Sequence, residues 1–213
     1  MIRAAQPLRA VVSDFGGVLT APLLEGFALV QEDTGVPARA FGEALARAGE
    51  PNPLFALEVG AITEAEFIAA LERELEPILG HTVDLHGFAG RYMGSLAAND
   101  ALFDYYRGLH ARGIRLAICT NNVREWEPLW RAKLPIDEIF ETVVDSAFVG
   151  VRKPEPEIYA IVLERLGLEA GDCAFVDDIA ANVEAAAALG FAGVRFESTE
   201  QAIAALDALL DGR

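Results

Sequence analysis

The fold is decided by residues 10–20, which read AVVSDFGGVLT. Four small or apolar residues lead directly to Asp14, and the glycine pair Gly16 and Gly17 follows at once. A short apolar run that ends in a polar side chain and glycines is typical of a buried strand in a parallel sheet. The stretch therefore predicts an α/β protein whose first strand carries a carboxylate to the edge of its sheet.

The same arrangement recurs twice further along the chain. Thr120 and Asn121 follow the apolar run LAIC, and Asp177 and Asp178 follow the apolar run AFV. In an open α/β sheet, ligands bind beyond the carboxyl ends of the strands. One aspartate after a strand is as often a helix N-cap as a catalytic group, but three polar clusters at equivalent strand ends indicate one shared site.

Between these runs, apolar stretches alternate with segments of helical periodicity, which is the pattern of a parallel sheet covered by helices. We predict strands at residues 10–12, 115–119, 142–144, 173–176 and 193–196. We predict helices at residues 100–111, 156–166, 179–189 and 200–210. The expected fold class is α/β, with a Rossmann-like parallel sheet core, helices on both faces and an inserted α-helical cap.

The insertion is predicted from the long stretch between the first two strands, which contains helical patterns and no convincing strand. Thr63 and Glu66 have the spacing of a capping box, and an apolar helical face follows them. A first crossover normally needs far fewer residues. We therefore expect residues 1–20 and 97–213 to form the core domain and residues 21–96 to form a helical cap domain.

The composition of the 213-residue chain is globular, with 53% hydrophobic and 23% charged residues. A net charge of −16 argues against nucleic acid or a membrane as a partner, because polyanions would repel the chain. No apolar run approaches the roughly 20 residues that cross a bilayer, and the apolar stretch before Asp14 is too short for a secretory signal. We expect a cytoplasmic protein in which Cys119 and Cys173 are buried, unpaired thiols, with a disulfide between them as the less favoured alternative. The pattern indicates no particular oligomeric state.

The residue types at the strand ends indicate phosphate chemistry. The carboxylates of Asp14, Asp177 and Asp178 are hard oxygen ligands of the kind that Mg²⁺ prefers. Gly16 and Gly17 leave the backbone open to a bound phosphate or metal. These residues predict a Mg²⁺ site beside a phosphate.

Neutral and cationic groups for the phosphate are also present. The Thr120 hydroxyl and the Asn121 amide could hold phosphoryl oxygens. Lys153 is one of only two lysines in the chain, and it directly precedes a proline ahead of a predicted helix. A cation this rare at this place favours a role in binding an anion over a solvated surface charge. The expected ligand is a small phosphorylated molecule.

Four segments resemble, in order, the motifs of the haloacid dehalogenase-like (HAD) hydrolase superfamily. They are DFGGVLT at residues 14–20, ICTN at 118–121, KPEPEIY at 153–159 and FVDDIAAN at 175–182. Each motif alone is short, but all four in this order, with a helical insertion after the first, are specific. The third and fourth are most similar to those of the phosphatase branch, as in the N-terminal domain of soluble epoxide hydrolases.

The resemblance implies a phosphoric monoester hydrolase that works through a covalent aspartyl-phosphate. Asp14 would be the nucleophile, and Thr120 and Lys153 would bind the transferring phosphoryl group. Gly17 and Asn121 would add substrate contacts. The helical cap would move to admit substrate and exclude water.

The resemblance also implies the metal ligands. Mg²⁺ would be held by the Asp14 carboxylate, the backbone carbonyl of Gly16 and Asp178, with Asp177 close by. One position departs from the pattern, because phosphatases of this superfamily usually carry a second aspartate where this chain has Gly16. That aspartate acts as general acid and base, a role worth about 10²–10⁴-fold in rate.

The departure leaves three explanations open. The leaving group needs little protonation, as in anomeric or acyl phosphates; or a cap residue or a water substitutes; or the protein mainly binds its ligand. The alternatives to a phosphatase are therefore a 2-haloacid dehalogenase-like hydrolase and a catalytically weak ligand-binding or regulatory protein. Dehalogenases are described as metal-free and without the acidic pair, so Asp177 and Asp178 favour the metal-dependent branch. The branch that forms a Schiff base on a cap lysine is excluded, because the insertion contains no lysine.

Overall fold

Five parallel strands form the centre of the molecule, in the order β3-β2-β1-β4-β5. The computed structural model describes residues 8–22, 31–32, 34–49 and 51–212. The strands are β1 (Ala10–Ser13), β2 (Arg115–Thr120), β3 (Thr142–Asp145), β4 (Cys173–Asp177) and β5 (Ala192–Arg195). The predicted strands are confirmed; the first four begin at the predicted residue, and the last begins one residue before it.

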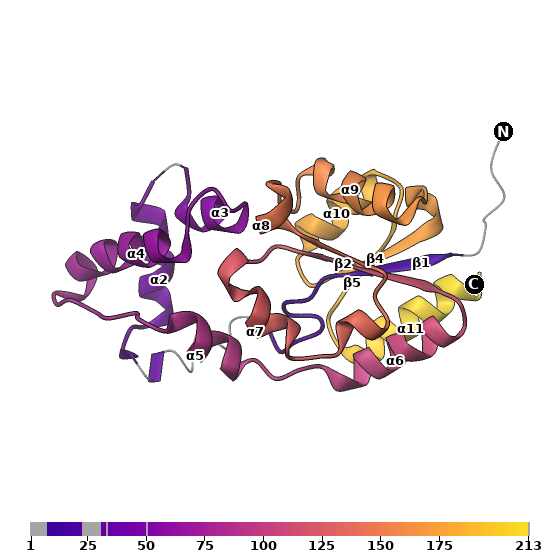
Figure 1. Ribbon diagram of the computed structural model, residues 1–213, viewed down its shortest axis with the longest axis horizontal. Helices are drawn as coiled ribbons and strands as arrows, with labels where there is room; N and C mark the ends of the chain where they lie inside the picture. Colours follow the sequence, from indigo (N-terminus) through magenta and orange to yellow (C-terminus); the bar gives the residue numbers. More distant parts are fainter. Residues whose placement is uncertain (1–7, 23–30, 33, 50, 213) are drawn as a thin grey trace.

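Helices cover both faces of this sheet (Figure 1), with α6 (Asp100–Ala111) and α11 (Thr199–Leu210) on one face and α9 (Pro156–Leu166) and α10 (Ala180–Ala188) on the other. The alternation of side chains along a strand divides the core into two layers. Val11 packs in the layer of α6 and α11, whereas Ala10 and Val12 pack in the layer of α9 and α10. All three side chains are fully buried, which explains why the strand reads as a continuous apolar run. The predicted α/β fold class is confirmed.

The helices of the core begin and end at capping residues. The Asn99 side chain accepts a hydrogen bond from the N–H of Leu102 at 3.2 Å and caps α6. Pro156 is the first residue of α9, where its missing N–H costs nothing, and Gly167 ends that helix in the left-handed conformation. Short elements complete the core, namely α7 (Glu127–Arg131), α8 (Ser146–Val149) and the 3₁₀ helices η1 (Arg124–Trp126), η2 (Ile136–Glu138) and η3 (Ala170–Asp172).

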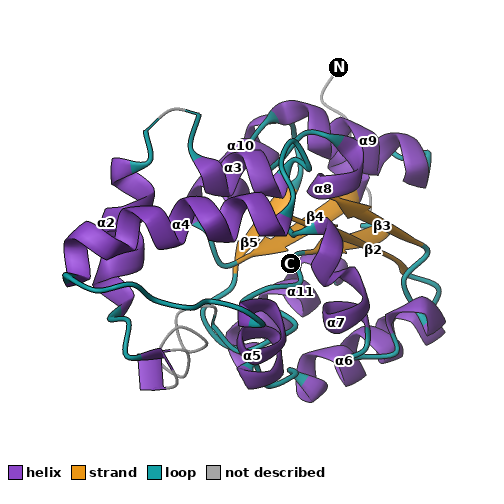
Figure 2. Cartoon of the chain, turned by 60° about the vertical axis from the view of Figure 1, so that its left-hand side comes forward, coloured by secondary structure: helices purple, strands orange, loops and turns teal. Residues whose placement is uncertain are grey.

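In the part of the chain that the structure describes, four further helices lie between β1 and α6 in the sequence and stand beside the sheet (Figures 1 and 2). They are α2 (Ala38–Arg47), α3 (Pro53–Glu58), α4 (Glu64–Leu79) and α5 (Phe88–Ser95), called the inserted helices below. The predicted capping box is confirmed, since Glu66 N–H donates to Thr63 Oγ and Thr63 N–H donates to Glu66 Oε2. Phe67 and Leu71 on α4 are buried and form part of its apolar face.

The two connections to the inserted helices run side by side. Thr20 and Ala98 form an isolated antiparallel bridge, and Ala21 N–H donates to the carbonyl of Ala97 at 2.8 Å. This pairing joins the start and the end of the insertion at one place on the core. Parts of the two predicted domains, residues 1–7 and 23–30, lie outside the described residues.

The structure also bears on the predicted thiols and on membrane spans. Cys119 and Cys173 are both buried and unpaired, as predicted. No helix in the described part of the chain is both long enough and apolar enough to span a bilayer.

Candidate active site

The carboxylates predicted to share a site meet at the carboxyl end of the sheet. Ser13 of β1 is paired in register with Val176 of β4, so the aspartates that follow these two residues, Asp14 and Asp177, emerge on neighbouring strands. One oxygen from each of Asp14, Asp177 and Asp178 lies within 4.8 Å of the others. Asp14 is 6% exposed and Asp177 fully buried, so this acidic cluster sits at the bottom of the site.

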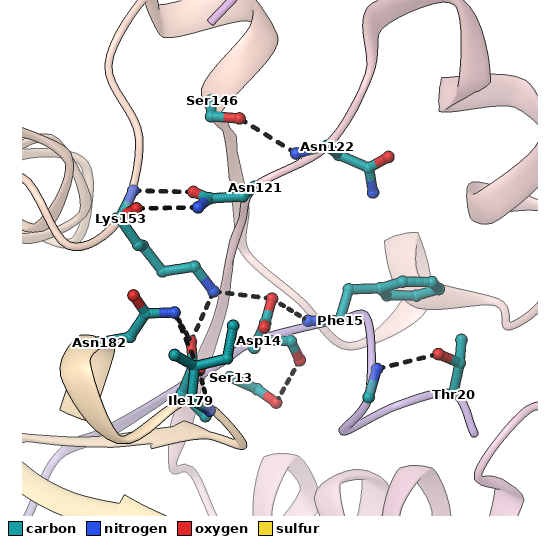
Figure 3. Close-up of polar contacts among 12 residues, drawn as sticks. Ser13, Asp14, Phe15, Thr20, Asn121, Asn122, Ser146, Lys153, Ile179 and Asn182 are labelled. Atoms are coloured by element: carbon teal, nitrogen blue, oxygen red, sulfur yellow. Dashed lines mark hydrogen bonds and ion pairs between the residues drawn. The ribbon is translucent and has the colours of Figure 1, made fainter. Parts of the chain in front are cut away.

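Lys153 reaches into this cluster from the loop before α9 (Figure 3). Its Nζ lies 2.8 Å from Asp14 Oδ1 and 2.6 Å from Asp177 Oδ2. Burial lowers the pKa of the Lys153 ammonium, but the two carboxylates raise the pKa by more, so Lys153 stays protonated. Burial raises the pKa of Asp14 to about 7, with Lys153 acting in the opposite direction and Asp177 adding to the rise.

Asn121 holds the loop that carries Lys153. Its Oδ1 accepts a hydrogen bond from the Lys153 N–H at 2.8 Å, and its Nδ2 donates to the Lys153 carbonyl at 2.9 Å. This bidentate contact spans 32 positions of sequence and joins the end of β2 to the third motif. Thr120 lies just before it as the last residue of β2 and is 1% exposed. The structure therefore brings the second motif, as well as the first, third and fourth, to the same edge.

The residues at this edge fit a divalent cation. When all three carboxyl groups are ionised, they and the one ammonium leave two negative charges in the cluster, which one Mg²⁺ would balance. Gly17 has a positive φ of 77°, and a Cβ at this position would lie 2.5 Å from Asp178 Oδ2. The Asp178 carboxylate therefore lies directly against the backbone of the first motif, where a side chain would displace it. Hard oxygen donors in such an arrangement match the preference of Mg²⁺.

Asn182 is part of this site, although the sequence did not single it out. Its Nδ2 lies 3.0 and 3.1 Å from the two carboxylate oxygens of Asp177, and the backbone N–H of Ile179 donates to the same carboxylate at 2.8 Å. Tyr159 Oη donates to the carbonyl of Asn182 at 2.9 Å. These contacts fix the carboxylate that in turn fixes Lys153. The signal was present in the sequence, since Asn182 closes the motif FVDDIAAN.

A second contact missed by sequence reasoning joins the inserted helices to the loop of Lys153. Glu58, the last residue of α3, places Oε2 2.6 Å from Arg152 Nε, and the Arg152 guanidinium lies 3.9 Å from the ring centroid of Phe55. Ser146 Oγ donates to the Glu58 carbonyl at 2.5 Å. Burial raises the pKa of Glu58, and Arg152 opposes that rise. No motif marks Glu58, because only the placement of the insertion brings it here.

Comparison with known proteins assigns the family. The model of the haloacid dehalogenase-like hydrolases matches residues 8–190. This range covers most of the chain and all four motifs, so the chain belongs to the haloacid dehalogenase-like hydrolases. The resemblance seen in the sequence is confirmed.

Three curated relatives extend this result. Acyl-CoA dehydrogenase family member 10 of Mus musculus is 29% identical over 95% of this chain and 19% of its own length. Bifunctional epoxide hydrolase 2 of Sus scrofa is 24% identical over 94% of this chain and 38% of its length. Phosphatase MT3486 of Mycobacterium tuberculosis is 32% identical over 70% of this chain and 71% of its length. The chain thus spans well under half the length of the first two relatives.

Solved structures share the fold. A predicted HAD-like family hydrolase from Porphyromonas gingivalis superposes with a TM-score of 0.71 at 25% identity, covering 96% of this chain and 98% of the other. A HAD family enzyme from Bacteroides thetaiotaomicron, in complex with magnesium and inorganic phosphate, superposes with a TM-score of 0.66 at 21% identity, covering 89% and 94% of the two chains. The second likeness shows the fold alone.

Proposed function

We propose that the protein is a Mg²⁺-dependent phosphatase of small phosphorylated molecules that acts through an aspartyl-phosphate on Asp14. The observation that carries the proposal is the buried Lys153 ammonium between the carboxylates of Asp14 and Asp177, with Asp178 close by. A nucleophilic carboxylate beside a fixed cation is what transfer of a dianionic phosphoryl group requires.

In the proposed reaction, each residue of the site has a separate role in phosphoryl transfer. An Asp14 carboxylate oxygen forms a bond to phosphorus while the bond from phosphorus to the leaving oxygen breaks. Lys153 offsets the charge that develops on the phosphoryl oxygens, and the Thr120 hydroxyl binds one of these oxygens. Asn121 positions Lys153 through its backbone. Water then attacks the phosphorus of the aspartyl-phosphate, releases inorganic phosphate and regenerates Asp14.

Mg²⁺ would be held by Asp14, the Gly16 carbonyl and Asp178. When bound, the cation supplies positive charge that stabilises the phosphoryl oxygens in the transition state. Asp177 would act mainly by holding Lys153, since both of its oxygens already accept hydrogen bonds within the protein. The acidic cluster and the magnesium and phosphate complex of the Bacteroides thetaiotaomicron enzyme support this proposal.

The inserted helices would serve as the cap, with residues 21–96 as the inserted domain and 1–20 and 97–213 as the core. The bridge between Thr20 and Ala98 supports these limits, because the two connections meet there. A cap over the site excludes water from the reaction and selects the substrate.

The test is phosphate release from a panel of phosphomonoesters in Mg²⁺ and in EDTA. Asp14→Asn removes the nucleophile with little change in shape and should abolish turnover, while Asp104→Asn, on the exposed face of α6, should leave it unchanged. Turnover that persists in EDTA, or in Asp14→Asn, would refute the proposal.

A further inference from the structure

A cavity of about 170 Å³ lies between the inserted helices and the carboxyl edge of the sheet. At the sheet edge it is lined by Phe15 and Asn121, which directly follow Asp14 and Thr120 in the chain, and by Gly16. The remaining lining is dominated by apolar side chains of the inserted helices and by aromatic rings. The cavity is therefore the place where the part of the substrate beyond the phosphate would lie.

Among the polar groups that line this cavity, the indole N–H of Trp126 has no hydrogen-bond partner in the described part of the chain, whereas the groups at the sheet edge and Glu58 are already engaged. Asn122 Oδ1 accepts from the next backbone N–H at 2.9 Å, and Thr20 Oγ bonds to neighbouring backbone groups. Asn121 is held by the loop of the catalytic lysine, and Glu58 is paired with Arg152. A leaving group rich in hydroxyls, such as a sugar, would lose its hydrogen bonds to water and gain few in return.

The size and the walls of the cavity suit one aromatic ring. An engineered apolar cavity of roughly 150 Å³ in another protein binds benzene. Here Phe88, Tyr92 and Trp126 form a cluster with centroid separations of 5.6, 5.8 and 6.1 Å. Rings at such separations offer edges and faces to a further aromatic ring.

Gly16 favours the same class of leaving group. Its φ lies outside the left-handed region, so the backbone does not require glycine there. Because Gly16 has no side chain, this position offers no acid that could protonate the leaving oxygen. A phenol-type oxygen, with a pKa of about 10, departs as an anion far more readily than an alkoxide, whose conjugate acid is close to water at roughly 16.

We propose that the substrate is a small aryl phosphate, in which a phosphate is esterified to a compact, uncharged aromatic ring seated in this cavity. The proposal rests on the phosphatase function proposed above. As Asp14 bonds to phosphorus, the ester bond breaks and its electron pair leaves with the aryl oxide, which takes a proton from water. Hydrolysis of the aspartyl-phosphate completes the turnover.

The test compares kcat/KM for matched phosphate esters in Mg²⁺. Phenyl phosphate should exceed 4-carboxyphenyl phosphate, whose charge the cavity rejects, by at least about tenfold. The kcat/KM for propyl phosphate should exceed that for glycerol 3-phosphate by about 10- to 100-fold, because the cavity offers few partners to the glycerol hydroxyls, although the glycerol oxygen is the better leaving group. Equal kcat/KM values within the first pair would overturn the uncharged aryl class, and equal values within the second would overturn the exclusion of hydroxyl-rich leaving groups; either result leaves the phosphatase intact.

Turnover of none of these esters would refute the phosphatase itself, and binding then tests the cavity separately. In calorimetric titrations with Mg²⁺, phenylphosphonate should bind at least about tenfold more tightly than methylphosphonate. Equal affinities would overturn the proposed seat for the ring.

Variants that fill the cavity locate the effect. Leu71→Phe on α4 and Leu54→Phe on α3 replace lining residues, and each should lower kcat/KM for phenyl phosphate more than about tenfold. Leu79→Phe adds the same atoms to α4 outside the lining and should leave this rate unchanged. Undiminished turnover in both filling variants, with folding confirmed by circular dichroism, would contradict the proposal.

Discussion

Replacing Lys153 by methionine should destabilise the protein strongly, in addition to its effect on catalysis. The side chain is 1% exposed, and its ammonium is the shared partner of Asp14 and Asp177. Methionine keeps the length of the side chain but leaves two buried carboxylates close together without a cation. Removing one partner of a buried ion pair costs about 3–5 kcal/mol. Asp177 retains Asn182 and the N–H of Ile179, so we expect about 3 kcal/mol.

The assay is urea unfolding in EDTA, so that no divalent cation replaces the lysine. The free energy of unfolding is measured for wild type, Lys153→Met, Asp14→Asn and the double variant. In the double variant one of the two stranded carboxylates is gone, so its loss should be smaller than the sum of the single losses by about 1–3 kcal/mol. Lys133→Met, at the only other lysine, removes a single bond to the Leu96 carbonyl and should cost about 1 kcal/mol.

A loss in Lys153→Met no larger than in the Lys133→Met control would refute this reasoning. So would additive losses in the double variant, because the two charges would then not interact. The prediction also bears on activity measurements, because loss of activity in a Lys153 variant indicates a catalytic role only under conditions in which the variant is folded.

Three further predictions follow from single contacts. Gly17→Ala places a Cβ 2.5 Å from Asp178 Oδ2 at a positive φ, and should weaken Mg²⁺ binding in calorimetry by about 10- to 100-fold. Gly94→Ala is the control, because a Cβ there would have no atom within 4 Å. Equal Mg²⁺ affinities of the Gly17 and Gly94 variants would contradict the metal site. Burial raises the pKa of Asp145 to about 6, so the folded state binds this proton more tightly than the unfolded state does. The free energy of unfolding therefore falls as pH rises from about 4 to 6 and the carboxyl group ionises. Asp145→Asn removes this ionisation and should be more stable than wild type above pH 6 by about 3 kcal/mol, with the difference vanishing near pH 4; a difference in unfolding free energy that does not change with pH would count against it. Gly16→Asp supplies the absent acid and should raise kcat/KM, which reports formation of the aspartyl-phosphate, by up to about 10²-fold for propyl phosphate and by little for phenyl phosphate. Equal gains in kcat/KM for both esters would show that protonation of the leaving group is not the function that Gly16 fails to supply.

The strands and the shared site were predictable because their signals are local. A run such as residues 10–12 is apolar at every position because both faces of the sheet are covered. Parallel strands then bring residues after their carboxyl ends to one edge, which is enough to predict that Asp14 and Asp177 meet. The start of β5 was displaced by one residue because Ala192 and Gly193 carry little strand signal.

The rest of the site depends on how the insertion folds back. Glu58 lies 94 positions from its partner Arg152, on a helix of six residues. No periodicity in the sequence shows where such a helix docks, and so neither this ion pair nor the cavity could be predicted. Asn121 is an intermediate case, because its position was predicted but its bidentate contact with the Lys153 backbone required the structure.

The measurement that tests the central claim most directly is acid quenching of the enzyme during turnover of phenyl phosphate, followed by mass spectrometry of its peptides. Without an aspartate at Gly16 to activate water, hydrolysis of the intermediate should be slow and the phosphorylated protein should accumulate. The account predicts one phosphoryl group on the peptide that contains Asp14, present within the first turnover and absent in Asp14→Asn. Turnover with no phosphoryl group on that peptide at any quench time would contradict it.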